Sequence, residues 1–322
     1  MREAERAAAA GTGSVTGRAL RVLEVFSPEA PVLTLTEISR LAGLPLTTAH
    51  RLVSELAGWG ALERDPAGGY RIGLRLWEIA ALAPRGLGLR EVALPHLSDL
   101  ARATGENVQL AVREDLSVVY VERLAGCGSV PVLTRVGGRF ALTPTGVGRV
   151  LLAHAPADVQ ERALAQRPVR YTERTECDPV RLRRLLAEVR RSGVAVCERQ
   201  VTPDSVSVAA PVHGPGTGGA NGPYGTGSSG AVGNAGGVGA EVVAAVSVVA
   251  HVETVPAHTL VPLVQAAASG ISRALGAPHG SVNRPAPRPR YADAGRSRSR
   301  TDRQVTQPSS FSNSPMSTGT GS

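Results

Sequence analysis

The feature that most constrains the fold lies between residues 15 and 73, where three short helical segments are followed by a hairpin. Residues 34–37 have the spacing of a capping box, in which Thr34 and Glu37 each accept a hydrogen bond from the other's backbone amide. A tight turn is expected at 43–45, because glycine accepts positive φ and proline cannot continue a helix. Residues 15–26 and 46–58 have the apolar period of a helix on either side of this unit.

The apolar side chains of these segments indicate one small core. The side chains that we expect to point inward are Val15, Ala19, Val22, Leu23, Phe26, Ile38, Leu41, Ala42, Ala49, Leu52, Val53 and Leu56. The strands of the hairpin, 60–65 and 69–73, flank Pro66-Ala67-Gly68. Their alternation predicts Leu62, Tyr70 and Ile72 inward, with Arg64 and Arg71 outward. This order of elements predicts a winged helix-turn-helix.

A winged helix-turn-helix binds double-stranded DNA, and the third helix has suitable residues. A helix fits the major groove, and the short side chains of Thr47 and Thr48 allow close approach. Arg51 has the length to reach a guanine edge or a phosphate. The alternative is a three-helix core with solvated arginines. The DNA-contacting residues that we expect are Thr36, Leu46, Thr47, Thr48, His50, Arg51, Arg64 and Arg71.

Composition excludes some functions. The formal charge is +8, but seven arginines and two aspartates lie in residues 277–322, so the basic character belongs mainly to the tail. All 35 basic residues are arginine, which excludes Schiff-base or Walker-type lysine chemistry. The three cysteines have no metal-ligand spacing and fit a reducing cytoplasm. No signal peptide and no apolar run of about 20 residues are present, so we expect a cytoplasmic protein without membrane contact.

The pattern along the chain predicts five segments. We expect a disordered N-terminus at 1–14, the DNA-binding domain at 15–83, a linker and connecting helix at 84–104, a second domain at 105–276 and a disordered Arg-rich tail at 277–322.

A glycine-rich insertion interrupts the second domain. Residues 214–240 hold twelve glycines and are expected to be a flexible loop. Strand-like residues 205–212 and 242–249 flank the insertion, which predicts a hairpin with a long tip. The alternative, a linker between domains, would leave residues 241–276 with one strand and one helix, too little for a core.

The second domain is predicted to be α+β. Residues 107–113 and 117–124 indicate a hairpin over Glu114-Asp115, and 130–136 indicate a further strand. A helix is expected over 145–154, and another begins at Asp178-Pro179, where an N-cap precedes a first-turn proline. The side chains of these two helices that are spaced for burial are Val147, Val150, Leu151, His154, Leu182, Leu185, Leu186 and Val189.

Several segments together resemble the IclR family of bacterial transcriptional regulators. Residues 35–52, LTEISRLAGLPLTTAHRL, look like its DNA-binding signature, and residues 69–73, GYRIG, like its wing. Further matches are FALTPTGVGRVLLA at 140–153, VRRSG at 189–193 and VAAPV at 208–212. The chain departs from the family pattern at Thr143, where His is usual, and at Arg149, where Lys is usual. The acidic pair usual in the family is reduced to Glu198-Arg199, and neither the insertion nor the tail is expected.

The resemblance implies a GAF-like effector-binding domain without cofactor or metal. It implies a ligand between the sheet and the loop entering the helix at Gly146, where free amides suit a carboxylate. For Ser207 and Ser247, a role as small core residues satisfied by backbone stays open. The positions that carry over by motif are Ser129, Val132, Gly146, Val147, Cys197, Ser205, Ser207, Ser247 and Val249.

The resemblance also implies a partner and a mode of action. It implies operator DNA, a small organic or aromatic acid as effector, repression more often than activation, and dimers that often pair into tetramers. A helix over 88–104, with Val92, Leu97, Leu100 and Ala101 on one side, would brace the dimer.

Two other functions compete with regulation. An enzyme would use His154, His213 and Cys197, but no nucleophile motif, carboxylate pair or metal spacing is present, so we expect no catalysis. An architectural DNA-binding protein would act through the Arg-rich tail and bind weakly without sequence preference.

Overall fold

The computed structural model describes residues 13–127, 129–215 and 241–276. The segments expected to be disordered (1–14, 214–240 and 277–322) fall almost entirely outside these residues. Within the described part, no helix is both long and apolar enough to cross a membrane.

The N-terminal part is the predicted winged helix-turn-helix. Its helices are α2 (Val15–Glu24), α3 (Leu35–Ala42) and α4 (Leu46–Trp59), and its wing pairs β1 (Leu62–Arg64) antiparallel with β2 (Tyr70–Ile72). The capping box is confirmed: the Thr34 amide donates to Glu37 Oε2 at 2.8 Å, and the Glu37 amide donates to Thr34 Oγ1 at 3.3 Å. Gly43 ends α3 at φ 63°, as the turn requires.

The core of this part contains most of the predicted side chains, with Val22, Ile38, Ala49, Leu52 and Val53 fully buried. Three predictions were wrong: Val15, Leu41 and Ile72 are exposed. In the eight-residue α3, Ile38 and Ala42 are buried and Leu35 packs against the core, while Leu44 after the turn is also buried there. Ile72 ends a three-residue strand at the edge of a two-stranded sheet, and Val15 is the first residue of its helix.

Replacing the cap should destabilise the N-terminal domain measurably. Thr34→Ala removes the acceptor of the Glu37 amide, and loss of such a cap costs about 1 kcal/mol of unfolding free energy. Thr36→Ala is the matched control, because Thr36 is exposed inside the same helix and alanine favours helix. Chemical denaturation of both variants, followed by circular dichroism, checks this. Equal stability of the two variants would contradict the assigned cap.

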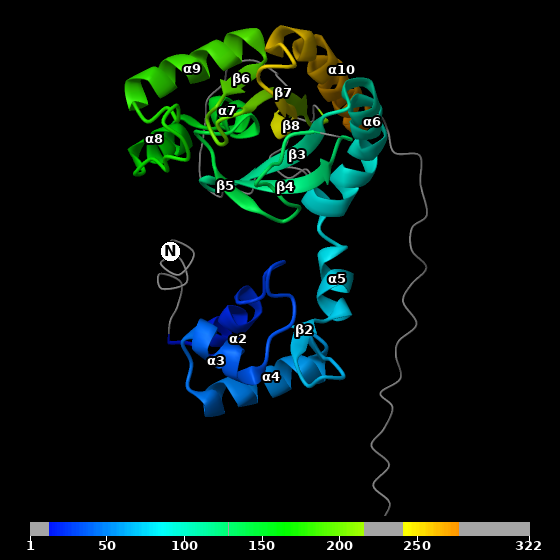
Figure 1. Ribbon diagram of the computed structural model, residues 1–322, viewed down its shortest axis with the longest axis vertical. Coiled ribbons are helices and arrows are strands. Elements are labelled where there is room, and N and C mark those ends of the chain that lie inside the picture. The colour runs from blue at the N-terminus through cyan, green and yellow to red at the C-terminus, as the bar shows by residue number, and fades with distance from the viewer. Residues whose placement is uncertain (1–12, 128, 216–240, 277–322) are drawn as a thin grey trace, which may run out of the picture. The chain divides into compact units, whose positions relative to one another are not determined.

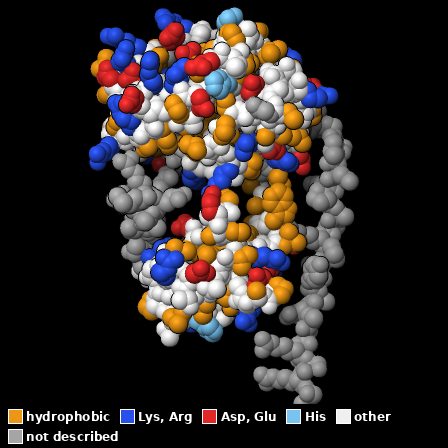
Figure 2. Space-filling model, viewed as in Figure 1, with side chains coloured by type: hydrophobic (Ala, Val, Ile, Leu, Met, Phe, Trp, Pro, Cys, Tyr) orange, Lys and Arg blue, Asp and Glu red, His pale blue; other side chains and the backbone are white. Residues whose placement is uncertain are grey.

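Helix α5 (Leu74–Ala80) follows the wing and has no buried residue. Leu74, Trp77 and Ile79 on α5 are 63%, 56% and 51% exposed, and Leu82 just beyond it is 66% exposed. Figure 2 shows the hydrophobic side chains gathered along this helix. Large apolar side chains concentrated in this way mark a surface that associates with another.

A π-helical turn, Pro84–Gly88, precedes α6 (Leu89–Thr104). The predicted bracing role of this helix in a dimer is wrong for two of the four residues named. Leu97 and Leu100 are buried in the core of the C-terminal domain, and Val92 and Ala101 pack against that core. Leu97 and Leu100 therefore offer no face to a second chain, and Val92 and Ala101 are half-buried.

The C-terminal domain is the predicted α+β fold, built on a six-stranded antiparallel sheet of order β5-β4-β3-β8-β7-β6 (Figure 1). Its strands are β3 (Asn107–Glu114), β4 (Ser117–Leu124), β5 (Arg139–Ala141), β6 (Ala195–Glu198), β7 (Ser205–His213) and β8 (Val242–His251). The predicted hairpin around the insertion is confirmed, because β7 and β8 pair from Ser205↔His251 to His213↔Val242.

Helices cover both faces of this sheet (Figure 1). One face packs against α6 and α10 (Ala257–Gly276). The other packs against α7 (Gly146–Ala153), α8 (Ala157–Ala165) and α9 (Pro179–Ser192). Asp178 caps α9 as predicted, accepting from the Val180 amide at 2.9 Å.

The prediction of a strand over residues 130–136 is wrong. This segment crosses one face of the sheet as a loop, held by side chains of β3: Asn107 Nδ2 donates to the Val130 carbonyl at 2.8 Å, and Gln109 Nε2 donates to Thr134 Oγ1 at 2.7 Å. The short edge strand β5 comes after the loop instead. The predicted burial of His154 is also wrong, because α7 ends at Ala153 and His154 is exposed at its C-cap.

Candidate functional site

The first candidate site is the exposed face of α4. Leu46, Thr47, His50 and Arg51 are exposed on this helix and Thr48 is half-buried, while Thr36 is exposed on α3. No side chain caps the start of α4, so its first-turn amides remain available for a phosphate. Arg51 NH1 lies 2.9 Å from Glu55 Oε1, in a pair that is solvent-exposed on both sides.

The wing contributes two arginines with different surroundings. Arg71 NH2 lies 3.1 Å from Glu63 Oε2 across the hairpin. The amide of Leu74, and then Arg71, lower the pKa of Glu63, so this carboxylate stays charged and orients Arg71. Arg64 is exposed at the end of β1, as predicted.

The second candidate site is a cavity in the C-terminal domain, with about 470 Å³ of space unoccupied by atoms, part of it open to solvent. It lies among the start of α7, strands β6, β7 and β8, and the loop crossing the sheet. The family resemblance assigned nine residues to the effector site, and seven of them line this cavity: Val132, Gly146, Val147, Cys197, Ser205, Ser207 and Val249.

Two glycines allow close approaches at the start of α7: Gly146 lies against β7, and Gly148 lies against the loop before the helix. A Cβ on Gly146 would lie 2.6 Å from Ser207 Oγ and 3.3 Å from Ala209 Cβ. A Cβ on Gly148 would lie 2.2 Å from the Leu142 carbonyl oxygen, which leaves no room for a side chain. Thr145 caps the helix by accepting from the Gly148 amide at 3.1 Å. The amides at this helix start therefore border the cavity, where they suit an anionic group.

The other two of these nine residues, Ser129 and Ser247, do not line the cavity. Ser129 donates to the Gly126 carbonyl at 3.0 Å within its own loop. Ser247 is fully buried on the strand β8 inside the sheet, and within the described residues its hydroxyl has no hydrogen-bond partner. Ser247 is therefore a small core residue, as the alternative proposed, but no backbone group satisfies its hydroxyl, while Ser207 does line the cavity.

The sequence reasoning missed nine residues of the cavity wall. Gln109 gave a signal, as a polar residue between the apolar Val108 and Leu110, and Tyr120 is a large aromatic in the neighbouring strand. Burial raises the pKa of the Tyr120 phenol, so it enters the wall as a neutral hydroxyl. The missed residues are Gln109, Tyr120, Leu133, Thr134, Pro144, Thr145, Gln200, Val201 and Thr202.

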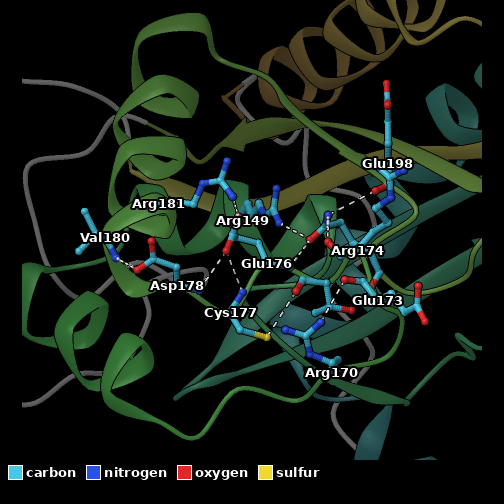
Figure 3. A network of polar contacts seen from close by, with 12 residues as sticks. Arg149, Arg170, Glu173, Arg174, Glu176, Cys177, Asp178, Val180, Arg181 and Glu198 are labelled. Carbon is cyan, nitrogen blue, oxygen red and sulfur yellow. Dashed lines mark hydrogen bonds and ion pairs between the residues drawn. The ribbon is translucent and has the colours of Figure 1, made fainter.

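A polar network extends from the cavity to the start of α9 (Figure 3). Its centre is Gln200, which lines the cavity. The Gln200 amide oxygen accepts from Arg149 NH2 at 2.7 Å and from the Glu176 amide at 2.9 Å. Its amide nitrogen donates to the Arg174 carbonyl at 2.7 Å. This network fixes the segment before α9 to the cavity wall.

The geometry gives the enzyme alternative no support. Cys197 lines the cavity, but His154 and His213 do not. Burial raises the pKa of the Cys197 thiol, which disfavours the nucleophilic thiolate. In the described ranges, no three His, Cys, Asp or Glu side chains are placed to hold a metal ion.

A winged helix-turn-helix and a cavity-bearing α+β domain in one chain define a ligand-responsive DNA-binding protein. Residues 15–66 match the family model described as IclR helix-turn-helix domain, and residues 82–217 match bacterial transcriptional regulator IclR C-terminal. The chain belongs to the IclR family of bacterial transcriptional regulators. It therefore carries a DNA-binding domain and an effector-binding domain and is a transcriptional regulator, not an enzyme.

Individual relatives agree with this assignment. The HTH-type transcriptional regulator KipR of Bacillus subtilis is 30% identical over 196 residues, 61% of this chain and 78% of that protein. The transcriptional repressor IclR of Escherichia coli is 26% identical over 193 residues, 58% of this chain and 70% of that protein. A solved IclR homolog from Microbacterium hydrocarbonoxydans, complexed with 4-hydroxybenzoate, is 34% identical with a TM-score of 0.71, covering 81% of this chain and 99% of that one.

Proposed function

We propose that this regulator is a cytoplasmic repressor that binds an operator and changes its affinity when a small aromatic carboxylic acid enters the cavity. The observation that carries the proposal is the cavity wall, in which the amides at the start of α7 lie beside apolar and hydroxyl side chains. The IclR homolog solved with 4-hydroxybenzoate supports this class of ligand, and the Escherichia coli repressor supports repression.

The wall suits both ends of such an acid. We assign the carboxylate to the amides at Gly146 and Val147, where the helix dipole is positive. Val132 and Val249 offer apolar contact to the ring. Ser205 and Ser207 are placed to hydrogen-bond polar substituents, although the Ser205 hydroxyl already accepts from Thr202 at 2.6 Å. Cys197 completes this part of the wall.

For DNA, we assign direct reading of base edges to Thr47, Thr48 and Arg51 on α4. The remaining candidates are assigned to the sugar-phosphate backbone, because they lie at the rim of this face or on the wing. These are Thr36, Leu46, His50, Arg64 and Arg71.

We also propose that the regulator works as a dimer, or a dimer of dimers, because one recognition helix reads too few base pairs to single out an operator. The exposed apolar side chains of α5 are the surface that we assign to the contact between chains. Leu74→Asp should therefore shift the protein to monomer in light scattering at micromolar concentration. Glu78→Lys, which changes a charged residue of the same helix, is the control. A wild-type monomer under these conditions would contradict the assignment.

A DNA footprint upstream of the protein's own gene tests the proposed function. We expect a protected site with two-fold symmetry, and we expect 4-hydroxybenzoate or a related acid to weaken the protection. Weak binding without sequence preference, reproduced by the Arg-rich tail alone, would favour the architectural function instead.

A further inference from the structure

Arg149 is a buried cation behind the cavity. It lies on α7, one turn after Gly146, and is 4% exposed. Its Nε donates to the Thr143 carbonyl at 2.8 Å, and its NH2 donates to the Gln200 amide oxygen at 2.7 Å. Both acceptors are neutral. Among the described residues, Arg149 forms no ion pair within 4.0 Å.

The nearby carboxylates are engaged elsewhere. Glu176 Oε1 accepts from the Cys177 and Asp178 amides at 3.0 and 2.9 Å, and its Oε2 lies 3.5 Å from Arg181 NH1. Figure 3 shows the Glu198 side chain extending away from Arg149. The charge of Arg149 is therefore left without a carboxylate partner.

The field of this charge reaches the cavity. Arg149 does not line the cavity itself, but its partner Gln200 and the thiol of Cys197 both do. The Arg149 guanidinium lowers the pKa of the Cys197 thiol, against the larger raising effect of burial. The charge of Arg149 thus affects the pKa of a thiol that lines the cavity.

An unpaired charge in a protein interior is costly unless an opposite charge compensates it. An anion in the cavity supplies that compensation, and a neutral molecule of the same shape does not. We propose that Arg149 is a specificity-determining residue, which makes the cavity select anions over neutral isosteres through its charge and through Gln200 rather than by direct contact. The inference rests on the proposed function in placing the effector in this cavity.

Cys197 provides a probe that needs no knowledge of the effector. Iodoacetate and iodoacetamide both alkylate a thiolate with loss of iodide, and they differ mainly in charge. Because both attack the same thiolate, its ionised fraction cancels in the ratio of the two rates. The exposed Cys127 in the same chain is the internal reference. Peptide mass spectrometry of the full-length protein measures both sites together.

We expect the ratio of the iodoacetate rate to the iodoacetamide rate to be higher at Cys197 than at Cys127. Arg149→Met should lower the ratio at Cys197 by about tenfold, the order expected of a unit charge several ångströms away in a protein interior. Arg149→Lys keeps the charge and should keep the ratio. Thermal melting shows which variants fold. If Arg149→Met does not fold, Arg149→Gln takes its place.

The other outcomes would overturn the inference. An unchanged ratio in Arg149→Met would show that the charge does not reach the cavity. An equal fall in Arg149→Lys would indicate a packing role for the guanidinium. A Cys197 that reacts with iodoacetamide but not with iodoacetate would show that small anions do not enter.

A second measurement separates this inference from the proposed function. Calorimetry should show that wild type prefers 4-hydroxybenzoate to 4-hydroxybenzamide and that Arg149→Met loses about tenfold of this preference. If the alkylation ratios behave as expected and wild type binds neither compound, the proposed ligand class is wrong and the role of Arg149 stands. If wild type prefers the acid and Arg149→Met keeps the full preference, the role of Arg149 is wrong and the ligand class stands.

Discussion

Gly146→Ala should abolish effector binding and leave the protein folded. The new Cβ would lie 2.6 Å from Ser207 Oγ and 3.3 Å from Ala209 Cβ, so one of these groups must shift, and we expect the start of α7 to move away from β7. The amides that we assign to the carboxylate move with it. We expect at least about 100-fold weaker binding of 4-hydroxybenzoate, equivalent to about 2.7 kcal/mol, measured by calorimetry.

A second substitution tests whether this contact is the cause. Ser207→Ala removes the atom that the new methyl group would meet, so the double variant Gly146→Ala, Ser207→Ala should recover part of the lost affinity. Ser207→Ala alone should lose much less than Gly146→Ala. Unaltered affinity in Gly146→Ala would show that the ligand does not depend on the position of this helix start.

Arg51→Ala should remove sequence-specific binding. Arg51 is exposed on the recognition face, and its ion pair with Glu55 is solvated and therefore weak enough to exchange for a base contact. A bidentate contact to guanine is worth about 1–3 kcal/mol of discrimination. We expect operator affinity to fall by about tenfold or more, with little change on random DNA, in fluorescence anisotropy titrations.

Two variants of neighbouring charges serve as comparisons for Arg51→Ala. Arg71→Ala should weaken operator and random DNA alike, because Arg71 is assigned to the backbone. Glu55→Gln removes the partner of Arg51 in the free protein and should not weaken operator binding. An equal loss on operator and random DNA for Arg51→Ala would count against direct reading by this residue.

Local signals in the sequence were sufficient for the N-terminal domain. The capping box at Thr34 and Glu37 and the glycine turn at Gly43 depend on residues at most a few positions apart, and all of them appear in the structure. The pairing of β7 with β8 was also predictable, because both segments are apolar and rich in valine on either side of a glycine-rich insertion. Leu41 and Ile72 were misplaced because local periodicity does not show which neighbours occupy the core.

The cavity was predictable only in part, for a related reason. Residues at the start of α7 and on β7 were found through motif positions, such as Gly146 and Ser207. Gln109 and Gln200 were missed because their places depend on partners 25 and 51 positions away, Thr134 and Arg149. Long-range contacts of this kind also hold residues 130–136 as a loop over the sheet. The composition of this segment had indicated a strand.

The most direct test of ligand-controlled DNA binding is an anisotropy titration of full-length protein on its footprinted operator, with and without saturating 4-hydroxybenzoate. We predict that the acid raises the dissociation constant for the operator by about tenfold or more, and that Gly146→Ala binds the operator normally but no longer responds to the acid. The same operator dissociation constant with and without bound acid in the wild-type protein would contradict the account.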